Sequence, residues 1–194
     1  AEYRILLRQD NADARLTETA YNLGLASRER YDHWLKKKAE IERIVSFCNS
    51  TNVKPRDVNA ALESFGTTPM QFGATISSLI ARPQLSINQL ASAIAPLRAA
   101  LDIDDARCDE IIEAAEILIK YDGYIKRERQ IADKMHRLED IRIKGHFNYE
   151  ELHEISTEGR QKLMRINPET LGQASRIPGV SPSDINVLLV LMHR

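Results

Sequence analysis

The sequence predicts an all-α protein: a multi-helical bundle with one long helix and a compact C-terminal helical module. Capping residues repeatedly precede apolar residues at spacings of three and four, and β-branched alternation is rare. The apolar content, 43% of 194 residues, is enough for a hydrophobic core. The opening residues allow one short strand with alternating faces: Tyr3, Ile5 and Leu7 on one side, and Arg4, Leu6 and Arg8 on the other.

Helix signals then follow one another. Ser27 caps a helix that runs to about Cys48, in which we place Lys36-Lys37-Lys38 on the solvent side. Short helices with Pro near the start or Gly at the end come next. The predicted spans are 28–48, 55–65, 68–81 and 86–95.

From Asp105, apolar residues step by threes and fours to Leu138, which predicts one helix of about thirty residues. Gly123 lies inside this stripe and costs up to about 1 kcal/mol relative to Ala. It therefore marks a kink, a boundary or a close backbone approach, and two helices meeting at Gly123 are the alternative. Tyr121 and Tyr124 share the stripe, so we prefer core tyrosines to ligand-facing ones.

Three compact helices are expected over 149–155, 157–166 and 168–176. The last helix has the fullest set of signals, with Ser181 as cap, Pro182 at the first position and Asp184 in the first turn. We divide the chain into residues 1–24, a helical spacer over 25–104, and a C-terminal helical module over 105–194.

Composition excludes several classes of function. The 27 basic and 28 acidic residues carry no overall polyanion-binding signature, and no apolar run is long enough to cross a bilayer. Cys48 and Cys108 are isolated, which fits a reducing compartment, by default the cytoplasm. The histidines lack zinc-ligand spacing, and no dinucleotide, triphosphate or acyl-enzyme motif occurs. We expect no catalytic residue and no metal site in this chain.

Charge is distributed unevenly along the chain. Residues 83–119 hold two basic and seven acidic side chains, whereas residues 120–144 hold eight and five. The string K-Y-D-G-Y-I-K-R, which begins at Lys120, alternates the aromatic and cationic residues that stack on bases and neutralise phosphates. Its cations can face a polyanion, but solvated charge is the simpler interpretation.

The string I-P-G-V-S-P, residues 177–182, leads into the last helix. It suggests a helix-hairpin-helix turn, whose backbone amides can bind phosphate. A tight turn between two helices, with Gly179 at positive φ, is the alternative that we prefer from the residues alone.

Three strings resemble the MnmG (GidA) family of tRNA-modifying enzymes. The first is A-E-Y-R-I-L-L-R-Q-D-N-A-D-A-R-L-T at the start, and the second is K-Y-D-G-Y-I followed by cations. The third joins Ser156, Glu158, Arg160, Lys162 and Leu163 to P-E-T-L-G-Q-A-S-R-I-P-G-V-S-P. The helical spacer is the weakest match, with Gln84 and Ile87 where an acid and an aromatic are usual.

This resemblance implies a flavoenzyme that installs an aminomethyl-type group at C5 of the wobble uridine of tRNA, using FAD, NADH and a methylene-carrying folate. It implies the GTPase MnmE as partner and a homodimer formed through a flavin domain upstream of this chain. We therefore expect a docking module that holds no cofactor of its own.

Two groups of site residues follow. The border of the tRNA-facing cleft is expected at Arg4, Arg8, Asn11, Asp13 and Arg15. Docking of MnmE or tRNA is expected at Lys120, Tyr121, Gly123, Tyr124, Lys126, Arg127, Arg160, Lys162, Gly172, Gln173, Arg176 and Gly179. The rival interpretations are a general helix-hairpin-helix nucleic-acid-binding module and a protein-only scaffold.

Overall fold

The computed structural model describes residues 3–192, and these confirm the all-α class. Ten helices and one two-stranded sheet lie within this range. The helices are α1 (Ala12–Asn22), α2 (Arg28–Ser50), α3 (Pro55–Ser64), α4 (Ile76–Ile80), α5 (Ile87–Ala93), α6 (Ala95–Ala100), α7 (Cys108–Glu139), α8 (Thr157–Ile166), α9 (Leu171–Ser175) and α10 (Pro182–Met192). Strands β1 (Asn52–Val53) and β2 (Ala74–Thr75) pair antiparallel.

The chain forms two compact units, residues 1–126 and 127–194, whose boundary falls inside α7. The domain boundaries predicted from the sequence stay a prediction. Among the described residues, no helix has both the length and the apolar character needed to cross a bilayer.

The short strand allowed at the N-terminus is not formed. Residues 3–7 make a turn in which the backbone amides of Leu6 and Leu7 both donate to the carbonyl of Tyr3, at 2.9 and 3.0 Å. Tyr3 has a φ of +61°, outside the extended region. A strand at this position would have no second strand to pair with, so its backbone groups form local hydrogen bonds instead.

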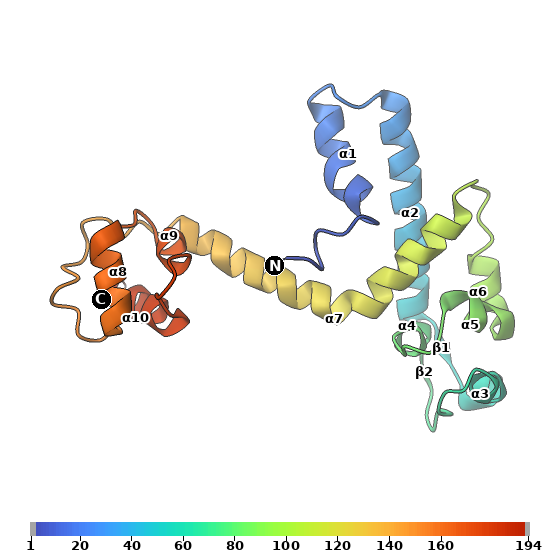
Figure 1. Ribbon diagram of the computed structural model, residues 1–194. Coiled ribbons are helices and arrows are strands. Elements are labelled where there is room, and N and C mark those ends of the chain that lie inside the picture. The colour runs from blue at the N-terminus through green and yellow to red at the C-terminus, as the bar shows by residue number, and fades with distance from the viewer. Residues whose placement is uncertain (1–2, 193–194) are drawn as a thin grey trace. The chain divides into compact units, whose positions relative to one another are not determined.

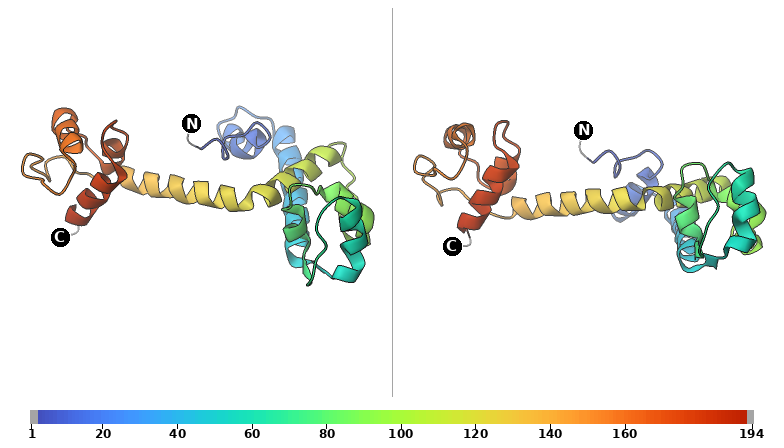
Figure 2. Two further views of the ribbon diagram at one scale, coloured as in Figure 1. Left: turned by 60° about the horizontal axis from the view of Figure 1, so that its bottom comes forward. Right: turned by 90° about the horizontal axis from the view of Figure 1, so that it is seen from below.

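In the first unit, α1 and α2 form a helical hairpin, and α3 to α6 gather at the far end of α2 (Figure 1, Figure 2). Ser27 caps α2 as predicted, by accepting a hydrogen bond from the amide of Arg30. The core is built from side chains of α2 to α6 and the first half of α7, and none of its members comes from α1. Its fully buried members include Ile44, Cys48, Leu62, Ile76, Ile80, Leu90, Leu97 and Ile111.

The helix predicted to begin at Thr68 is wrong, because α4 begins only at Ile76. The side-chain amide of Asn59 donates to the carbonyl of Met70 at 3.0 Å and accepts from its amide at 2.8 Å. These bonds hold the preceding loop, and Thr75 then caps α4. The helix predicted over residues 149–155 is also wrong, because these residues form turns.

Helix α7 continues through Gly123 without a break, so the alternative of two helices is wrong. In the second unit, α8, α9 and α10 pack with the end of α7 around a separate core. Ser156 caps α8, and Asn167 ends it in the left-handed conformation. Fully buried members of this core are Ile143, Leu163, Leu171, Ala174 and Leu188.

Candidate functional site

The N-terminal element, which we define as residues 3–15, is held together by its own polar side chains. The guanidinium of Arg8 donates to both carboxylate oxygens of Asp10, at 2.9 Å each for the closest pairs, and to the carbonyl of Ile5 at 2.6 Å. The hydrogen bond from Arg8 lowers the pKa of Asp10 below its usual range. Arg8 therefore closes the turn that precedes α1. The first two residues of the A-E-Y-R string lie outside the described residues.

Asn11 and Arg15 extend this closure into α1. The side-chain amide of Asn11 donates to the carbonyl of Leu6 at 2.9 Å, and its oxygen accepts from Arg15 Nε at 2.9 Å. Arg15 also donates to the carbonyl of Arg8 at 3.2 Å. Of the predicted cleft-border cations, Arg8 alone is ion-paired, whereas Arg4 and Arg15 are exposed and form no ion pair with any residue in the range 3–192.

Lys37 joins three helices and was missed by the sequence analysis. The expectation that all three lysines of the run face solvent is wrong, because Lys37 is 4% exposed while Lys36 and Lys38 are exposed. Its ammonium donates to the carboxylate of Asp13 on α1, at 2.7 Å, and to that of Glu110 on α7. Burial alone lowers the pKa of Lys37, but the two carboxylates outweigh burial and raise it.

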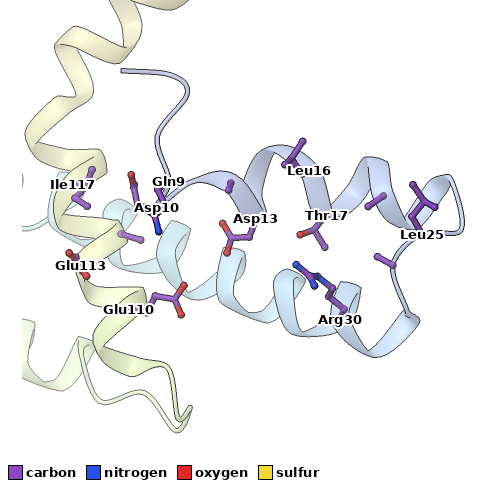
Figure 3. A pocket seen from close by; sticks show the side chains of 14 residues that line it. Gln9, Asp10, Asp13, Leu16, Thr17, Leu25, Arg30, Glu110, Glu113 and Ile117 are labelled. Carbon is purple, nitrogen blue, oxygen red and sulfur yellow. The ribbon is translucent and has the colours of Figure 1, made fainter. Parts of the chain in front are cut away.

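A pocket of about 830 Å³ opens beside this contact, between α1, the start of α2 and α7. Figure 3 shows the carboxylates of Asp13 and Glu110 among its polar side chains, with Arg30 reaching in from α2. Its other acidic residues are Asp10 and Glu113. A flavin dinucleotide carries a diphosphate, which needs cations or free amides. Because carboxylates dominate the polar lining, this pocket does not fit FAD.

Tyr121 and Tyr124 are surface residues, so the preference for core tyrosines is wrong. They are 44% and 62% exposed, and their ring centroids lie 6.3 Å apart. The reason is that α7 packs through Ile111, Ala115 and Ile119, a row spaced by four residues that faces away from Tyr124. The two rings are therefore accessible to a partner.

Of the neighbouring cations on α7, Lys120 is held in a partly buried ion pair, whereas Lys126 and Arg127 are exposed. Lys120 pairs with Glu116 at 2.8 Å, and the exposed Lys126 pairs with Asp122 at 2.8 Å. Arg127 is exposed and forms no ion pair among the described residues. A Cβ added at Gly123 would meet no atom within 4 Å. Nothing in the described fold therefore requires glycine at this position.

Gly172 and Gly179, in contrast, lie against carboxylates of their own unit. A Cβ on Gly172 would come within 2.6 Å of Glu139 Oε1, and Glu139 pairs with Arg176. Gly179 has a φ of +97°, and an added Cβ would collide with the carboxylate of Glu158. Both glycines are thus covered by internal anions where a phosphate would have to approach.

The remaining predicted docking residues of the second unit also have internal roles or little exposure. Gln173 accepts from the amide of Glu169 at 2.8 Å. Arg160 is hydrogen-bonded to His153 Nδ1 at 2.9 Å, and Lys162 is half-buried. Arg160 and Lys162 share α8, whereas Gly172 and Gln173 share α9.

Asp184 organises the two best-capped helices of this unit. It is 3% exposed and accepts hydrogen bonds from the amide and hydroxyl of both Ser156 and Ser181, at 2.7 to 2.9 Å. Burial alone raises the pKa of Asp184, but these four bonds outweigh burial and lower it. One carboxylate therefore links the caps of α8 and α10.

The described cysteines and histidines form no metal site. Within residues 3–192, no group of three or more metal-ligating side chains could hold an ion. Cys48 is fully buried, and burial raises the pKa of its thiol to about 11, which keeps it protonated and unreactive at neutral pH.

Comparison with known proteins covers the whole chain. Residues 28–129 match the family described as "tRNA modifying enzyme MnmG/GidA C-terminal helical domain", and residues 131–194 match the corresponding "C-terminal helical bundle". A protein of Phocaeicola vulgatus, named tRNA uridine 5-carboxymethylaminomethyl modification enzyme MnmG, is 57% identical over all of this chain and 31% of its own length. The protein of the same name from Cytophaga hutchinsonii is 41% identical over the same shares.

A solved structure agrees with these matches. GidA of Aquifex aeolicus, in its form II crystal, aligns with a TM-score of 0.60 and 29% identity over 96% of this chain and 28% of that one. The chain thus spans about 31% of the length of the curated relatives it matches.

Proposed function

The chain belongs to the MnmG/GidA family, and we propose that it serves the whole enzyme as a helical docking module. The whole enzyme, on this proposal, is a homodimeric, cytoplasmic flavoprotein that modifies C5 of the tRNA wobble uridine with FAD, NADH and methylene-folate. None of this cofactor chemistry is assigned to residues of this chain, and the polar lining of the pocket between α1, α2 and α7 is mostly carboxylate.

The observation that carries the docking proposal is the exposed pair Tyr121 and Tyr124. Two large aromatic side chains, 44% and 62% exposed, flank the only glycine of α7. The solvent-exposed face of a helix gains little stability from such residues, whereas aromatic rings stack on bases and anchor interfaces. We call Tyr121, Gly123 and Tyr124, with Lys120 and Lys126, the docking patch.

We propose tRNA as the ligand of the docking patch. Its rings can stack on unpaired bases, while Lys126 and the following Arg127 can neutralise phosphates. In the ion pair of Lys126 with Asp122, the two side chains are 70% and 57% exposed. An ion pair this exposed is weak, so it does little to prevent Lys126 from binding a phosphate.

The GTPase MnmE is the second candidate, favoured by a separate observation. A pocket of about 520 Å³ between α2 and α7 has Ile41, Val45 and Leu118 as its apolar lining, beside the polar residues Glu42, Ser46, Asn49 and Ser50. Leu118 is 36% exposed and lies one helical turn before Tyr121. Such an apolar surface suits a protein partner better than a nucleic acid.

The test is titration of the chain with a cognate tRNA at two salt concentrations and, separately, with MnmE. The variant Tyr121→Ala/Tyr124→Ala should weaken tRNA binding, since each stacked ring contributes about 1–3 kcal/mol. Phe72→Ala, which removes another aromatic ring that is 81% exposed, is the matched control and should change nothing. Lys126→Gln with Arg127→Gln should lower the salt slope by about one per phosphate contact.

Other outcomes identify the rivals. If the docking-patch variants lose MnmE binding while the salt dependence of tRNA binding stays the same, the docking patch is a protein interface. Equal affinity for any duplex would favour the general helix-hairpin-helix module. The absence of salt-dependent nucleic-acid binding would favour the protein-only scaffold.

A further inference from the structure

Helix α1 contributes no side chain to the described hydrophobic core of the first unit. Its only buried residue is Thr17, and Leu16 is 56% exposed. Its last turn is held on α2 by the ring of Tyr21, which stacks on that of Tyr31 with centroids 4.4 Å apart, so its first turn needs a separate contact. Something other than apolar burial must therefore fix this first turn relative to α2 and α7.

The contact that fixes the first turn of α1 against both α2 and α7 is made by Lys37 of α2. Its side chain is 4% exposed, whereas its partners Asp13 and Glu110 are 33% and 56% exposed. A buried ammonium without a counter-ion is strongly disfavoured. The carboxylates of Asp13 and Glu110 are partly exposed, so water could hydrate either of them if its helix moved away from Lys37. Among Lys37, Asp13 and Glu110, which we call the triad, Lys37 is therefore the residue that depends on both α1 and α7 being in place.

The triad of Lys37, Asp13 and Glu110 connects two regions for which a function is proposed, the cleft border and the docking patch. Asp13 lies in the first turn of α1, directly after the hydrogen-bonded turn that carries Arg8 and Asn11. Glu110 lies in the first turn of α7, the helix that carries the docking patch. Asp13 and Glu110 contact Lys37 but come from segments 97 positions apart in the sequence, shown together in Figure 3.

We propose that Lys37 is a positioning residue that fixes the N-terminal element against the first turn of α7. The cleft border and the docking patch then keep a fixed position relative to each other. This rests on the proposed function for its catalytic consequence, although the positioning itself does not. A displaced element would carry Arg8, Asn11 and Arg15 away from their places in the whole enzyme.

The positioning is tested by amide hydrogen exchange on the full chain. Lys37→Met should accelerate exchange of Ala12–Asn22 on the order of tenfold, while residues 44–48 in the core keep their protection. Lys36→Met, at the exposed neighbouring position, is the matched control and should leave both segments unchanged. Unchanged exchange of α1 in Lys37→Met would overturn the proposal.

A second variant separates coupling from a general loss of stability. Glu110→Gln changes an exposed side chain of α7, and it should accelerate exchange in α1 only where Lys37 is present to transmit the change. The same acceleration in the Lys37→Met background would mean that Glu110 acts by another route, which contradicts the triad as the coupling element.

The catalytic consequence is tested in the full-length enzyme. Lys37→Met should lower kcat for tRNA modification about tenfold or more, because small displacements of positioned groups are costly, and should leave the KM for tRNA within about twofold. A higher KM with unchanged kcat, or unchanged values of both, would overturn the positioning role. If the docking patch binds neither tRNA nor MnmE, the proposed function fails while the exchange results still stand.

Discussion

Two helical glycines, Gly159 and Gly123, show how differently one residue type can be used in this protein. Gly159 in α8 lies against the carboxylate of Asp184, which an added Cβ would approach to 2.7 Å. Gly123 in α7 has open space where its Cβ would be. The first glycine is explained by packing within its own unit, and the second is explained by nothing in the described chain.

This contrast separates motifs that build the fold from motifs available to a partner. Ser156, Glu158 and Gly179 all belong to strings that resemble the family, yet their contacts lie within the second unit: Ser156 donates to Asp184, and Gly179 lies against Glu158. The docking patch has the opposite character, since its rings are exposed and its glycine costs helix stability. Resemblance alone does not distinguish these two cases, whereas burial and contacts do.

The strongest test of the contrast is Asp184→Ala. Four donors lose their acceptor and the caps of α8 and α10 are disconnected, so we expect the second unit to lose about 3–5 kcal/mol of unfolding free energy. Urea denaturation monitored in the second unit measures this loss. Ser183→Ala, one residue away and exposed, is the control. A loss below about 1 kcal/mol would contradict the role assigned to Asp184.

Acid should reproduce part of this loss in the unmodified chain. Because the folded pKa of Asp184 lies below the unfolded value of ~3.9, its contribution is complete well above that value and is lost as the pH falls through the folded pKa. Urea midpoints between pH 7 and pH 3 should therefore converge for the unmodified chain and Asp184→Asn. Parallel curves would show that Asp184 titrates normally.

Gly159→Ala should cost about 1–3 kcal/mol, through overpacking against a side chain that cannot move. Asp184 is fixed by four hydrogen bonds, and Ser156 Oγ lies 2.8 Å from the added Cβ. Thermal unfolding measures the effect. If Gly159→Ala were stabilising, the second unit would be looser than its hydrogen bonds indicate.

Local signals predicted most of the fold. Ser27 and Ser181 were identified as caps because the side chain that caps a helix is adjacent to it in sequence. The wrong helix start at Thr68 has a tertiary cause, since Asn59 binds the backbone of Met70 from eleven positions away. No local pattern encodes that contact.

The candidate site was harder to predict, because exposure and ion pairing depend on packing. The tyrosines share the spacing of a core stripe, but α7 turns a different face inward. A signal for Lys37 did exist, since it continues the row Trp34, Ile41, Ile44 and Cys48 at spacings of three and four. A cation in an apolar row indicates a buried ion pair, but only the fold reveals that Asp13 and Glu110 are its partners.

The smallest expected effect is also the one that best sharpens the comparison. Gly123→Ala should stabilise the first unit by about 0.5–1 kcal/mol, because alanine favours the helix and its Cβ meets no atom within 4 Å. The same change should weaken tRNA binding roughly fivefold or more, equivalent to about 1 kcal/mol, if a ligand approaches the backbone at this point. Thermal unfolding and tRNA titration measure the two effects on one protein.

Gln130→Ala is the control for helix propensity, since it changes an exposed position of α7 without filling the space at Gly123. It should leave tRNA affinity unchanged. If Gly123→Ala is more stable and binds tRNA and MnmE as before, no partner requires this glycine. The contrast between Gly123 and Gly159 would then be one of packing alone. Opposite signs for stability and binding would show that this helix gives up intrinsic stability where a partner must come close.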